Sequence, residues 1–376
     1  MITFISNYSF PSNNATANRL NFFINSLLKS NKKIKVKVIS SVLKRSSNRQ
    51  KQENITIEQI SNYKYKNFLM RGIKELIFAY EASKRISKDC TFQIYTIPSP
   101  LILFGTYFRK TNFFAIDVRD VTWEYLEKKS FLGFVASKIL ILILNPIFQK
   151  AAFITCTNLS EKQSIKKCFK IEAIVIPNGI QEKKLQILSK LPSNKNFDSK
   201  LNVLYAGNIG IAQKLGILTD CAEKLNNFNF KIIGDGIEKK FLISEIKRKK
   251  LKNIVILPSV EWGDLLDHYS EADIFYAQIT KDFCSAVPSK IFEYISIGKK
   301  IVLGLPDGPA KNIFSKFSNV FIHVPEDEKD FLRIIKKAEN SKVEKIENNR
   351  ELIKEFIREN HEKSFIDLMK NTETWH

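Results

Sequence analysis

Cysteine is scarce in this sequence, which has only five in 376 residues. They are Cys90, Cys156, Cys168, Cys221 and Cys284. No two of them form a C-x-x-C pair, and their spacing fits no zinc template. We therefore expect reduced, buried thiols of a cytosolic protein rather than a disulfide framework or a metal site.

Long apolar runs are almost absent as well. The first residues, Met1–Ile5, are strand-like and lack a charged segment followed by an apolar run, so we expect no secretory signal. The most apolar stretch, 131–148, is interrupted by Lys138, Asn145 and Pro146, and is too short and broken to predict a transmembrane helix. We expect a buried helix of the first domain, and an interfacial helix that dips into a bilayer stays open as the alternative.

Acidic residues are few compared with basic ones. The sequence has 39 Asp and Glu against 60 Lys and Arg, a formal net charge of +21. The excess is mostly lysine and accompanies abundant asparagine and isoleucine, which favours compositional drift as its largest source. Attraction to an anionic membrane is the second interpretation and nucleic acid the third. The basic residues are dispersed and form no stripe with aromatic residues, so we expect no nucleic-acid partner.

Strand-like and helix-like segments alternate along nearly the whole chain, which predicts an α/β fold. The alternation stops in the polar segment 181–200 and then restarts. We expect two doubly wound, Rossmann-like domains at 1–180 and 201–345, a linker between them, and C-terminal helices at 346–376 that pack back on the first domain. The polar segment 44–56 predicts an exposed loop. Ligands of such sheets bind beyond the carboxyl ends of the strands, so the chemistry is expected in loops that face a cleft between the domains.

Four motifs lie at or after the ends of predicted strands. They are Val175-Ile176-Pro177-Asn178-Gly179-Ile180, Tyr205-Ala206-Gly207-Asn208-Ile209-Gly210, Ile232-Ile233-Gly234-Asp235-Gly236 and Pro288-Ser289-Lys290-Ile291-Phe292-Glu293-Tyr294. Gly207 and Gly210 allow a close approach of the backbone to a ligand because they have no Cβ. Pro288-Ser289-Lys290 predicts a helix start, whose N–H groups and dipole favour an anion.

Together these motifs resemble those of the GT-B glycosyltransferases, and within them the large retaining group often called family 4. A finer likeness, carried by Asp117–Glu124 and Gly207–Lys214, is to bacterial surface-polysaccharide enzymes similar to the N-acetyl-L-fucosamine transferases of O-antigen and capsule assembly. The resemblance implies two Rossmann-like domains, a nucleoside-diphosphate sugar as donor, retention of anomeric configuration, and no metal or other cofactor. We expect the donor to be UDP-linked. The sequence has no D-x-D metal motif.

The resemblance also implies a donor site in the second domain. Lys214 takes the place of a phosphate-binding base, and Glu293 that of a carboxylate that accepts hydrogen bonds from the ribose hydroxyls. Positive groups and N–H dipoles are needed there because the leaving diphosphate gains charge. The expected donor-binding residues are Gly207, Asn208, Lys214, Gly234, Ser289, Lys290 and Glu293. Solvated or turn-forming roles stay open for Lys214, Glu293 and the glycines.

The acceptor side is expected in the first domain. Asp120 is our first choice as catalytic base or sugar-positioning group, with Arg119 beside it as a partner or as a grip on an acceptor phosphate. A structural Arg–Asp ion pair is an equal alternative. The loop before the first helix places Asn13, Asn14 and Arg19 at the same cleft, where we expect them to bind the acceptor.

Three departures from the family pattern are visible: the first leaves the donor sugar open, and the second removes one cation from the diphosphate side. Ser285 stands where many members have the first of two glutamates, and Asn208 stands where many have arginine. A histidine in the first domain is also common in the family, whereas all four histidines of this sequence lie beyond residue 200. We expect transfer of a hexose or N-acetylhexosamine to a polysaccharide or lipid-linked oligosaccharide, in the cytoplasm, with peripheral contact to an anionic inner membrane face as a further expectation. A sugar-nucleotide epimerase of the same architecture and a non-catalytic regulator with a degenerate donor site are the alternatives.

Overall fold

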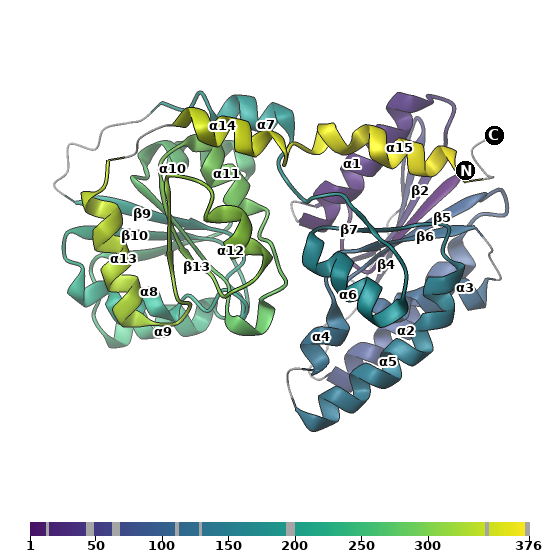
Figure 1. The fold of residues 1–376 in the computed structure, drawn as a ribbon, viewed down its shortest axis with the longest axis horizontal. Coiled ribbons are helices and arrows are strands. Elements are labelled where there is room, and N and C mark those ends of the chain that lie inside the picture. Colours follow the sequence, from purple (N-terminus) through teal and green to yellow (C-terminus); the bar gives the residue numbers. More distant parts are fainter. Residues whose placement is uncertain are drawn as a thin grey trace. The chain divides into compact units, whose positions relative to one another are not determined.

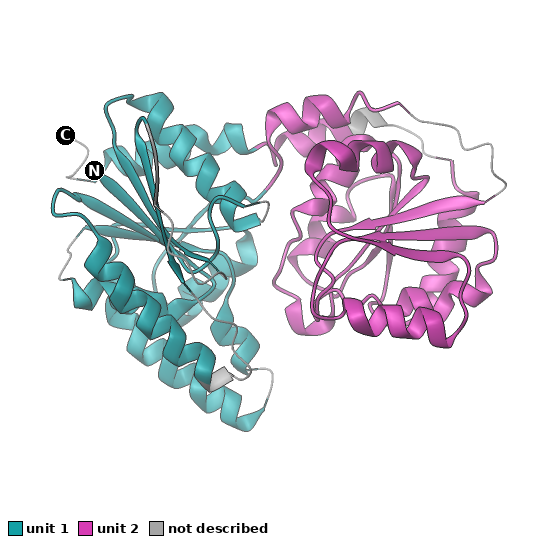
Figure 2. Ribbon diagram, turned by 180° about the vertical axis from the view of Figure 1, so that it is seen from behind, with its two compact units in different colours: residues 1–178, 358–376 teal, residues 179–357 magenta. Residues whose placement is uncertain are grey.

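The structure is a computed structural model that describes residues 1–12, 15–42, 49–61, 68–109, 113–127, 130–192, 200–342 and 346–372. The chain divides into two compact units, residues 1–178 with 358–376 and residues 179–357 (Figure 2). Each unit has a mainly parallel β-sheet with helices on both faces (Figure 1). This is the α/β architecture of two Rossmann-like domains that the sequence predicts.

Unit 1 has an eight-stranded sheet in the order β3-β4-β2-β1-β5-β6-β7-β8. Its strands are β1 (Ile2–Ser6), β2 (Val36–Val42), β3 (Arg49–Gln52), β4 (Ile55–Ser61), β5 (Phe92–Ile97), β6 (Phe114–Val118), β7 (Ile154–Cys156) and β8 (Ile174–Val175). Its helices are α1 (Ala15–Ser30), α2 (Phe68–Arg85), α3 (Gly105–Phe108), α4 (Thr122–Glu127), α5 (Phe131–Lys150), α6 (Leu159–Phe169) and α15 (Glu362–Lys370), with 3₁₀ turns η1 (Pro100–Phe104) and η4 (Arg358–His361). Only the β3–β4 pair is antiparallel among the described ladders.

The strands of unit 1 are apolar at successive positions because both faces of the sheet are covered. Phe4 packs in a core with helices α1 and α15, whereas its neighbour Ile5 packs in a core with α2, α5 and α6. On the first face, Phe23 of α1 lies against Phe365 of α15 with 4.3 Å between ring centroids. The C-terminal helix is therefore an integral part of unit 1.

Unit 2 has a six-stranded parallel sheet in the order β11-β10-β9-β12-β13-β14. Its strands are β9 (Leu201–Ala206), β10 (Phe228–Ile233), β11 (Ile254–Leu257), β12 (Ile274–Gln278), β13 (Lys300–Gly304) and β14 (Val320–His323). Its helices are α7 (Glu182–Leu188), α8 (Gly216–Cys221), α9 (Lys239–Arg248), α10 (Trp262–Glu271), α11 (Lys290–Ile297), α12 (Pro309–Phe314), α13 (Glu328–Asn340) and α14 (Ile346–Lys354), with 3₁₀ turns η2 (Ala222–Lys224) and η3 (Lys281–Phe283). Strand order reverses between β9 and β12, which is where doubly wound sheets bind ligands.

Three sequence predictions about elements need correction. Segment 44–56 was expected to be a loop, but β3 and the start of β4 lie within it. Strand β4 pairs in parallel with β2. The expected linker 181–200 begins with helix α7, whose Leu188 is buried in a core of unit 2. The expected C-terminal set 346–376 is split, because α14 packs against α11 in unit 2 and only 358–376 belongs to unit 1. For the second and third of these predictions, the short helices α7 and α14 left little signal in the sequence.

Helix α5 is not the buried helix that the sequence favours. Pro146 lies inside the helix without ending it, and α5 is the one helix in the described ranges that is long and apolar enough, by length and composition, to cross a membrane. One face is exposed, with Phe131, Leu132 and Leu142 at 78%, 79% and 74% exposure. Its other face joins the core, where Leu144, Ile147 and Phe148 are buried. The alternative of an interfacial helix therefore gains support.

The cysteines are all free, as expected. Cys156 and Cys221 are buried, and the other three are half-buried.

Candidate functional site

Two glycine turns of unit 2 pack directly against each other at the carboxyl ends of β9 and β10. Gly207 donates its N–H to the Ile233 carbonyl at 2.9 Å, and Ile209 donates to the Asp235 carbonyl at 2.9 Å. Gly234 has φ +156°, and a Cβ there would lie 1.9 Å from the Gly207 carbonyl oxygen. The N–H of Gly234 is also bonded to the Leu257 carbonyl. Gly234 is thus required for loop packing and its N–H is not available to a ligand, whereas its donor-binding role stays a prediction.

The turn after Gly207 keeps donors available for a ligand. In the fully described stretch 200–342, no hydrogen bond uses the backbone N–H groups of Asn208 or Gly210. The side chain of Asn208 instead donates to Gln213 Oε1 at 3.2 Å, and its carbonyl accepts from the Tyr205 hydroxyl at 2.6 Å. The N–H of Ile209 between them is bonded to Asp235, so Asn208 and Gly210 offer two separate donors to an anion. This geometry suits the phosphate role expected of the turn.

Lys214 closes the same loop. It has a positive φ of 40°, and its N–H donates to the Gly210 carbonyl at 3.1 Å. Gln278, at the end of β12, donates to the Lys214 carbonyl at 3.0 Å and fixes the loop to the sheet. The Lys214 ammonium pairs with Glu326, which raises the pKa of the lysine. Both partners are exposed, so an anionic ligand can replace Glu326 at little cost.

Helix α11 begins at the carboxyl edge of the same sheet. Ser289 is its N-cap but makes no side-chain capping bond, and within the described stretch no hydrogen bond uses the backbone N–H of Ser289 or Lys290. One turn later, Glu293 Oε2 accepts from the Tyr269 hydroxyl at 2.9 Å and lies 3.1 Å from Lys290 Nζ. Lys184 Nζ lies 3.5 Å from Glu293 Oε1. Burial alone would raise the pKa of Glu293, but Lys290 and Lys184 outweigh it and lower the pKa.

Tyr294 ties this helix to the glycine turn, a contact that sequence reasoning missed. Its hydroxyl accepts from the Ala206 N–H at 2.9 Å and donates to the Ala206 carbonyl at 3.2 Å, one residue before Gly207. The structure therefore brings the Gly207 turn and the Glu293 helix together at the end of β9. Lys184 and Tyr269 were also missed, since only tertiary packing brings them to Glu293.

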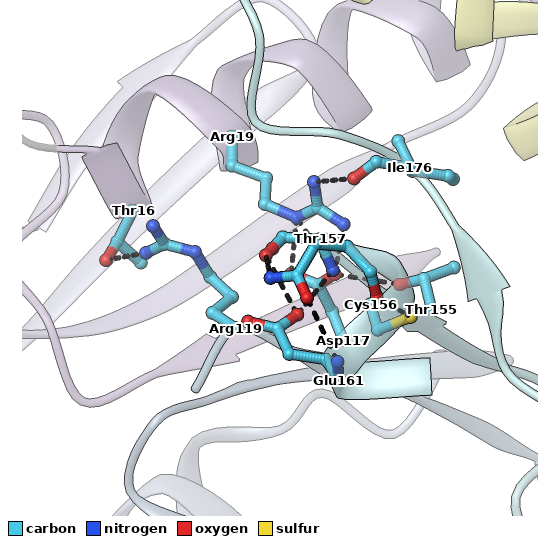
Figure 3. Close-up of polar contacts among 10 residues, drawn as sticks. Thr16, Arg19, Asp117, Arg119, Thr155, Cys156, Thr157, Glu161 and Ile176 are labelled. Atoms are coloured by element: carbon cyan, nitrogen blue, oxygen red, sulfur yellow. Dashed lines mark hydrogen bonds and ion pairs between the residues drawn. The ribbon is translucent and has the colours of Figure 1, made fainter. Parts of the chain in front are cut away.

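In unit 1, Arg19 and Asp117 form a buried ion pair (Figure 3). Arg19 Nη2 and Nε lie 2.7 and 2.9 Å from Asp117 Oδ1, and Nη1 donates to the Ile176 carbonyl at 2.6 Å. Thr155 donates to the same carboxylate at 2.8 Å. The side chains of Arg19 and Asp117 are only 2% and 1% exposed. Arg19 is therefore a structural residue, and its predicted acceptor-binding role is wrong because its donors are used inside the core.

Arg119 and Asp120 follow β6 at the carboxyl edge of the sheet. The Arg119 guanidinium donates through Nη1 to Thr16 of α1 rather than to Asp120, and its buried Nε has no hydrogen-bond partner among the described residues (Figure 3). Asp120 accepts a long hydrogen bond of 3.4 Å from Tyr125. Burial raises the pKa of Asp120 although Arg119 opposes the rise, and burial lowers the pKa of Arg119. A half-buried carboxyl group of raised pKa beside an unused N–H donor can accept a proton from a hydroxyl group.

Glu161 is a buried carboxyl group that the sequence reasoning missed. It accepts from the Thr157 N–H at 2.6 Å and the Thr157 hydroxyl at 2.8 Å, while its own N–H donates to the N-cap Asn158 at 3.0 Å (Figure 3). The N-x-x-E spacing of this capping box was the available signal. Burial raises the pKa of Glu161 to about 8, and the nearby charge of Asp120 adds to the rise. Asn13 and Asn14, predicted to bind the acceptor, lie outside the described residues.

Glu161 is expected to make unit 1 less stable as the pH rises. Its folded pKa of about 8 lies above the ordinary value of 4.5, so the folded state holds a proton that the unfolded state has released. Stability is fully present below the unfolded pKa and is lost as the pH approaches 8, with a slope of at most about 1.4 kcal/mol per pH unit. We expect Glu161→Gln, which imitates the protonated form, to remove about 1 kcal/mol of the difference in unfolding free energy between pH 6 and pH 7.

Urea unfolding followed by Trp123 fluorescence checks this result, in a background with Trp262→Phe and Trp375→Phe. Trp123 is buried and donates to Ser164 of α6 at 3.0 Å, so it reports on the surroundings of Glu161. An unchanged pH slope in Glu161→Gln would contradict the prediction.

Comparisons with known proteins concern the fold and the sequence of unit 2. Residues 189–359 match the family described as "Glycosyl transferases group 1". No curated protein sequence matches the chain significantly. Among solved structures, sucrose-phosphate synthase from Thermosynechococcus elongatus superposes with a TM-score of 0.78 at 13% identity, covering 98% of both chains.

Two further structures are similar. Anabaena HepE in complex with UDP and glucose gives a TM-score of 0.71 at 14% identity over 99% of both chains. A lipopolysaccharide outer core galactosyltransferase gives 0.64 at 15% identity over 98% of both chains. At these identities the structures establish the fold, whereas the family match concerns the sequence of unit 2. The chain thus has the GT-B fold of glycosyltransferases, and most of its second unit matches the group 1 glycosyl transferase family.

Proposed function

We propose that the protein is a glycosyltransferase that moves a hexose or N-acetylhexosamine from a nucleoside-diphosphate sugar to a glycan or lipid-linked acceptor. The observation that carries this proposal is the set of groups at the carboxyl edge of unit 2. Unpaired N–H groups at Asn208, Gly210 and the start of α11 accompany Lys214 and the carboxylate of Glu293, all inside the segment that matches group 1 glycosyl transferases.

These groups would bind different parts of the donor. The unpaired N–H groups and Lys214 would hold the diphosphate, whose charge grows as the bond to the sugar breaks. Glu293 is held ionised by two lysines and would accept hydrogen bonds from the ribose hydroxyls. A uridine base fits the proposal because one structurally similar protein binds UDP and glucose.

The proposal also covers the acceptor side, the course of the reaction and its place in the cell. In unit 1, Asp120 would accept the proton of the acceptor hydroxyl or position the acceptor, and the unused Nε of Arg119 would contact an anionic acceptor group. We propose retention of configuration without a metal ion, in the cytoplasm. The acceptor is proposed to belong to surface-polysaccharide assembly, such as O-antigen or capsule.

Donor turnover with a panel of sugar nucleotides tests the reaction. Release of UDP or GDP from one donor, increased by an acceptor, is the expected result. Appearance of an isomerised sugar nucleotide without acceptor would indicate an epimerase instead. Absence of nucleotide binding in calorimetry would indicate a degenerate site.

Lys214→Met is expected to weaken UDP binding about 10-fold, or ~1.4 kcal/mol. The lysine supplies a charge-assisted contact to the diphosphate, and its exposed pair with Glu326 is weak enough to exchange. Titration calorimetry measures the change. Lys354→Met is the matched control, because Lys354 also pairs with a glutamate on the surface of unit 2. Equal affinities in the two variants would contradict the phosphate role of Lys214.

A further inference from the structure

Unit 1 exposes an extended apolar surface on one side of its sheet. On α5 it includes Phe131, Leu132, Ile139 and Leu142, and on α2 it includes Ile73, Ile77 and Tyr80. Helix α3 adds Tyr107 and Phe108, and the Phe108 ring meets the Tyr80 ring at 5.5 Å. The turn η1 contacts both α2 and α5, and both views show these helices side by side (Figures 1 and 2). We call these exposed side chains the apolar face. Clusters of exposed large apolar side chains can mark interaction sites.

The second half of α5 shows that the helix does not cross a bilayer. Leu144, Ile147 and Phe148 are buried, and the Phe148 ring stacks on Phe169 of α6 at 3.9 Å. In the first half, Ser137 is also buried, and Leu140 and Ile141 pack against the same core. Only the outer face of the helix is therefore free to enter lipid. A bilayer can take up the apolar face only from one side.

The charges on the same helices indicate which partner fits. Helix α5 contains two lysines and no acidic residue, and α2 contains four basic residues. The two acidic side chains of α2 are neutralised, since Glu75 pairs with Arg71 and Glu81 pairs with Lys84 and Arg85. Lys84 Nζ lies 3.9 Å from the centre of the Tyr80 ring, and Lys138 Nζ lies 4.9 Å from that of Phe134. Lysine ammonium groups thus sit beside apolar rings, an arrangement that suits a boundary between hydrocarbon and anionic headgroups.

We propose that the apolar face docks unit 1 on an anionic lipid bilayer, with its apolar side chains inserted into one leaflet and its lysines at the headgroups. The exposed aliphatic side chains of Ile139, Leu142 and Ile143 and the absence of acidic residues from α5 fit a lipid surface better than a polar protein partner. The chain as a whole adds a formal charge of +21 that attracts anionic lipids. This proposal does not depend on the sugar donor or on the reaction.

Co-sedimentation of the full chain with vesicles tests the proposal. Vesicles of phosphatidylcholine with about one-third phosphatidylglycerol are compared with pure phosphatidylcholine at about 0.1 M and about 1 M salt. We expect binding to the anionic vesicles that weakens with salt but persists in part, because insertion of apolar side chains is not screened. The bound chain should move to fresh vesicles, unlike a membrane-spanning protein.

The triple variant Phe131→Ser, Leu132→Ser, Leu142→Ser should bind the anionic vesicles at least about 10-fold more weakly, since these exposed side chains contribute burial in lipid but none in the fold. The double variant Ile237→Ser, Phe241→Ser is the control, because it removes exposed apolar side chains from unit 2 and keeps the charge. Unchanged far-ultraviolet circular dichroism shows that each variant is folded. Three results would overturn the proposal: no binding of the wild type to anionic vesicles at low salt, equal binding by the triple variant, or a wild-type dimer that the triple variant dissociates.

Discussion

Replacing Asp117 by alanine is expected to lower the free energy of unfolding of unit 1 by about 3–5 kcal/mol. Among the described residues, the substitution leaves the buried guanidinium of Arg19 with the Ile176 carbonyl as its one hydrogen-bond acceptor, beside the Phe23 ring, and it deprives the Thr155 hydroxyl of its acceptor. A buried charge without a counter-ion is among the most destabilising changes in a protein core. Urea unfolding followed by Trp123 fluorescence measures the effect.

The pair Lys29–Glu362 supplies the control within the same unit. It joins α1 to α15, but Lys29 is 64% exposed, so Glu362→Ala should cost less than about 1 kcal/mol. The double variant Arg19→Met, Asp117→Leu should be much less destabilised than the sum of its single variants, because it removes both charges together. A cost for Asp117→Ala no larger than that for Glu362→Ala would contradict the assignment of a structural ion pair.

Replacing Glu293 by glutamine is expected to lower catalytic efficiency with the nucleotide-sugar donor by about 10- to 150-fold, or about 1.5–3 kcal/mol. An ionised carboxylate offers two strong acceptors to ribose hydroxyls, whereas an amide offers one weaker acceptor and presents a donor in place of the other. Lys184 and Lys290 are each partly exposed, so water can solvate them when the charge is removed. The loss should therefore appear in donor binding more than in stability.

Two comparisons separate a ribose contact from a structural role. Titrations should show weaker binding of UDP to Glu293→Gln but unchanged binding of inorganic diphosphate, which has no ribose. Glu351→Gln, which removes a carboxylate paired with a lysine three residues away on α14, should leave both affinities unchanged. Parallel losses for UDP and diphosphate would place Glu293 on the phosphates or in the packing of α11.

Regular periodicity made much of the fold predictable from the sequence. Strand β5, for example, is rich in apolar residues and buried at every position, because both faces of its sheet are covered. Strand β4 was missed because Glu58 and Gln59 make it look polar, although Lys37 and Arg85 neutralise Glu58 in the fold. The status of α5 was also misjudged, because composition alone does not distinguish a buried helix from one that presents its apolar side to the outside.

The candidate site was predictable where backbone geometry dictates residue type. Gly234 and Gly236 are an example, because a Cβ at either position would lie about 2 Å from a backbone carbonyl oxygen of the Gly207 turn. The roles of individual side chains were less accessible, since they depend on partners distant in sequence. Arg19 meets Asp117 across 98 residues, and Tyr294 meets Ala206 across 88. Sequence spacing contains no trace of such pairs without related sequences for comparison.

The order in which the chain is synthesised has a consequence for unit 1. Residues 179–357 form unit 2 as one continuous segment, whereas unit 1 needs residues 358–376 in addition to 1–178. Helix α15, which covers Phe23 and its neighbours on α1, leaves the ribosome after the whole of unit 2. Residues 1–178 are therefore synthesised first, but helix α1 stays uncovered until residues 358–376 follow, whereas unit 2 can already fold. This is the reverse of the usual order, in which the N-terminal domain folds first. During that interval, nascent chains are exposed to chaperones and to aggregation through α1.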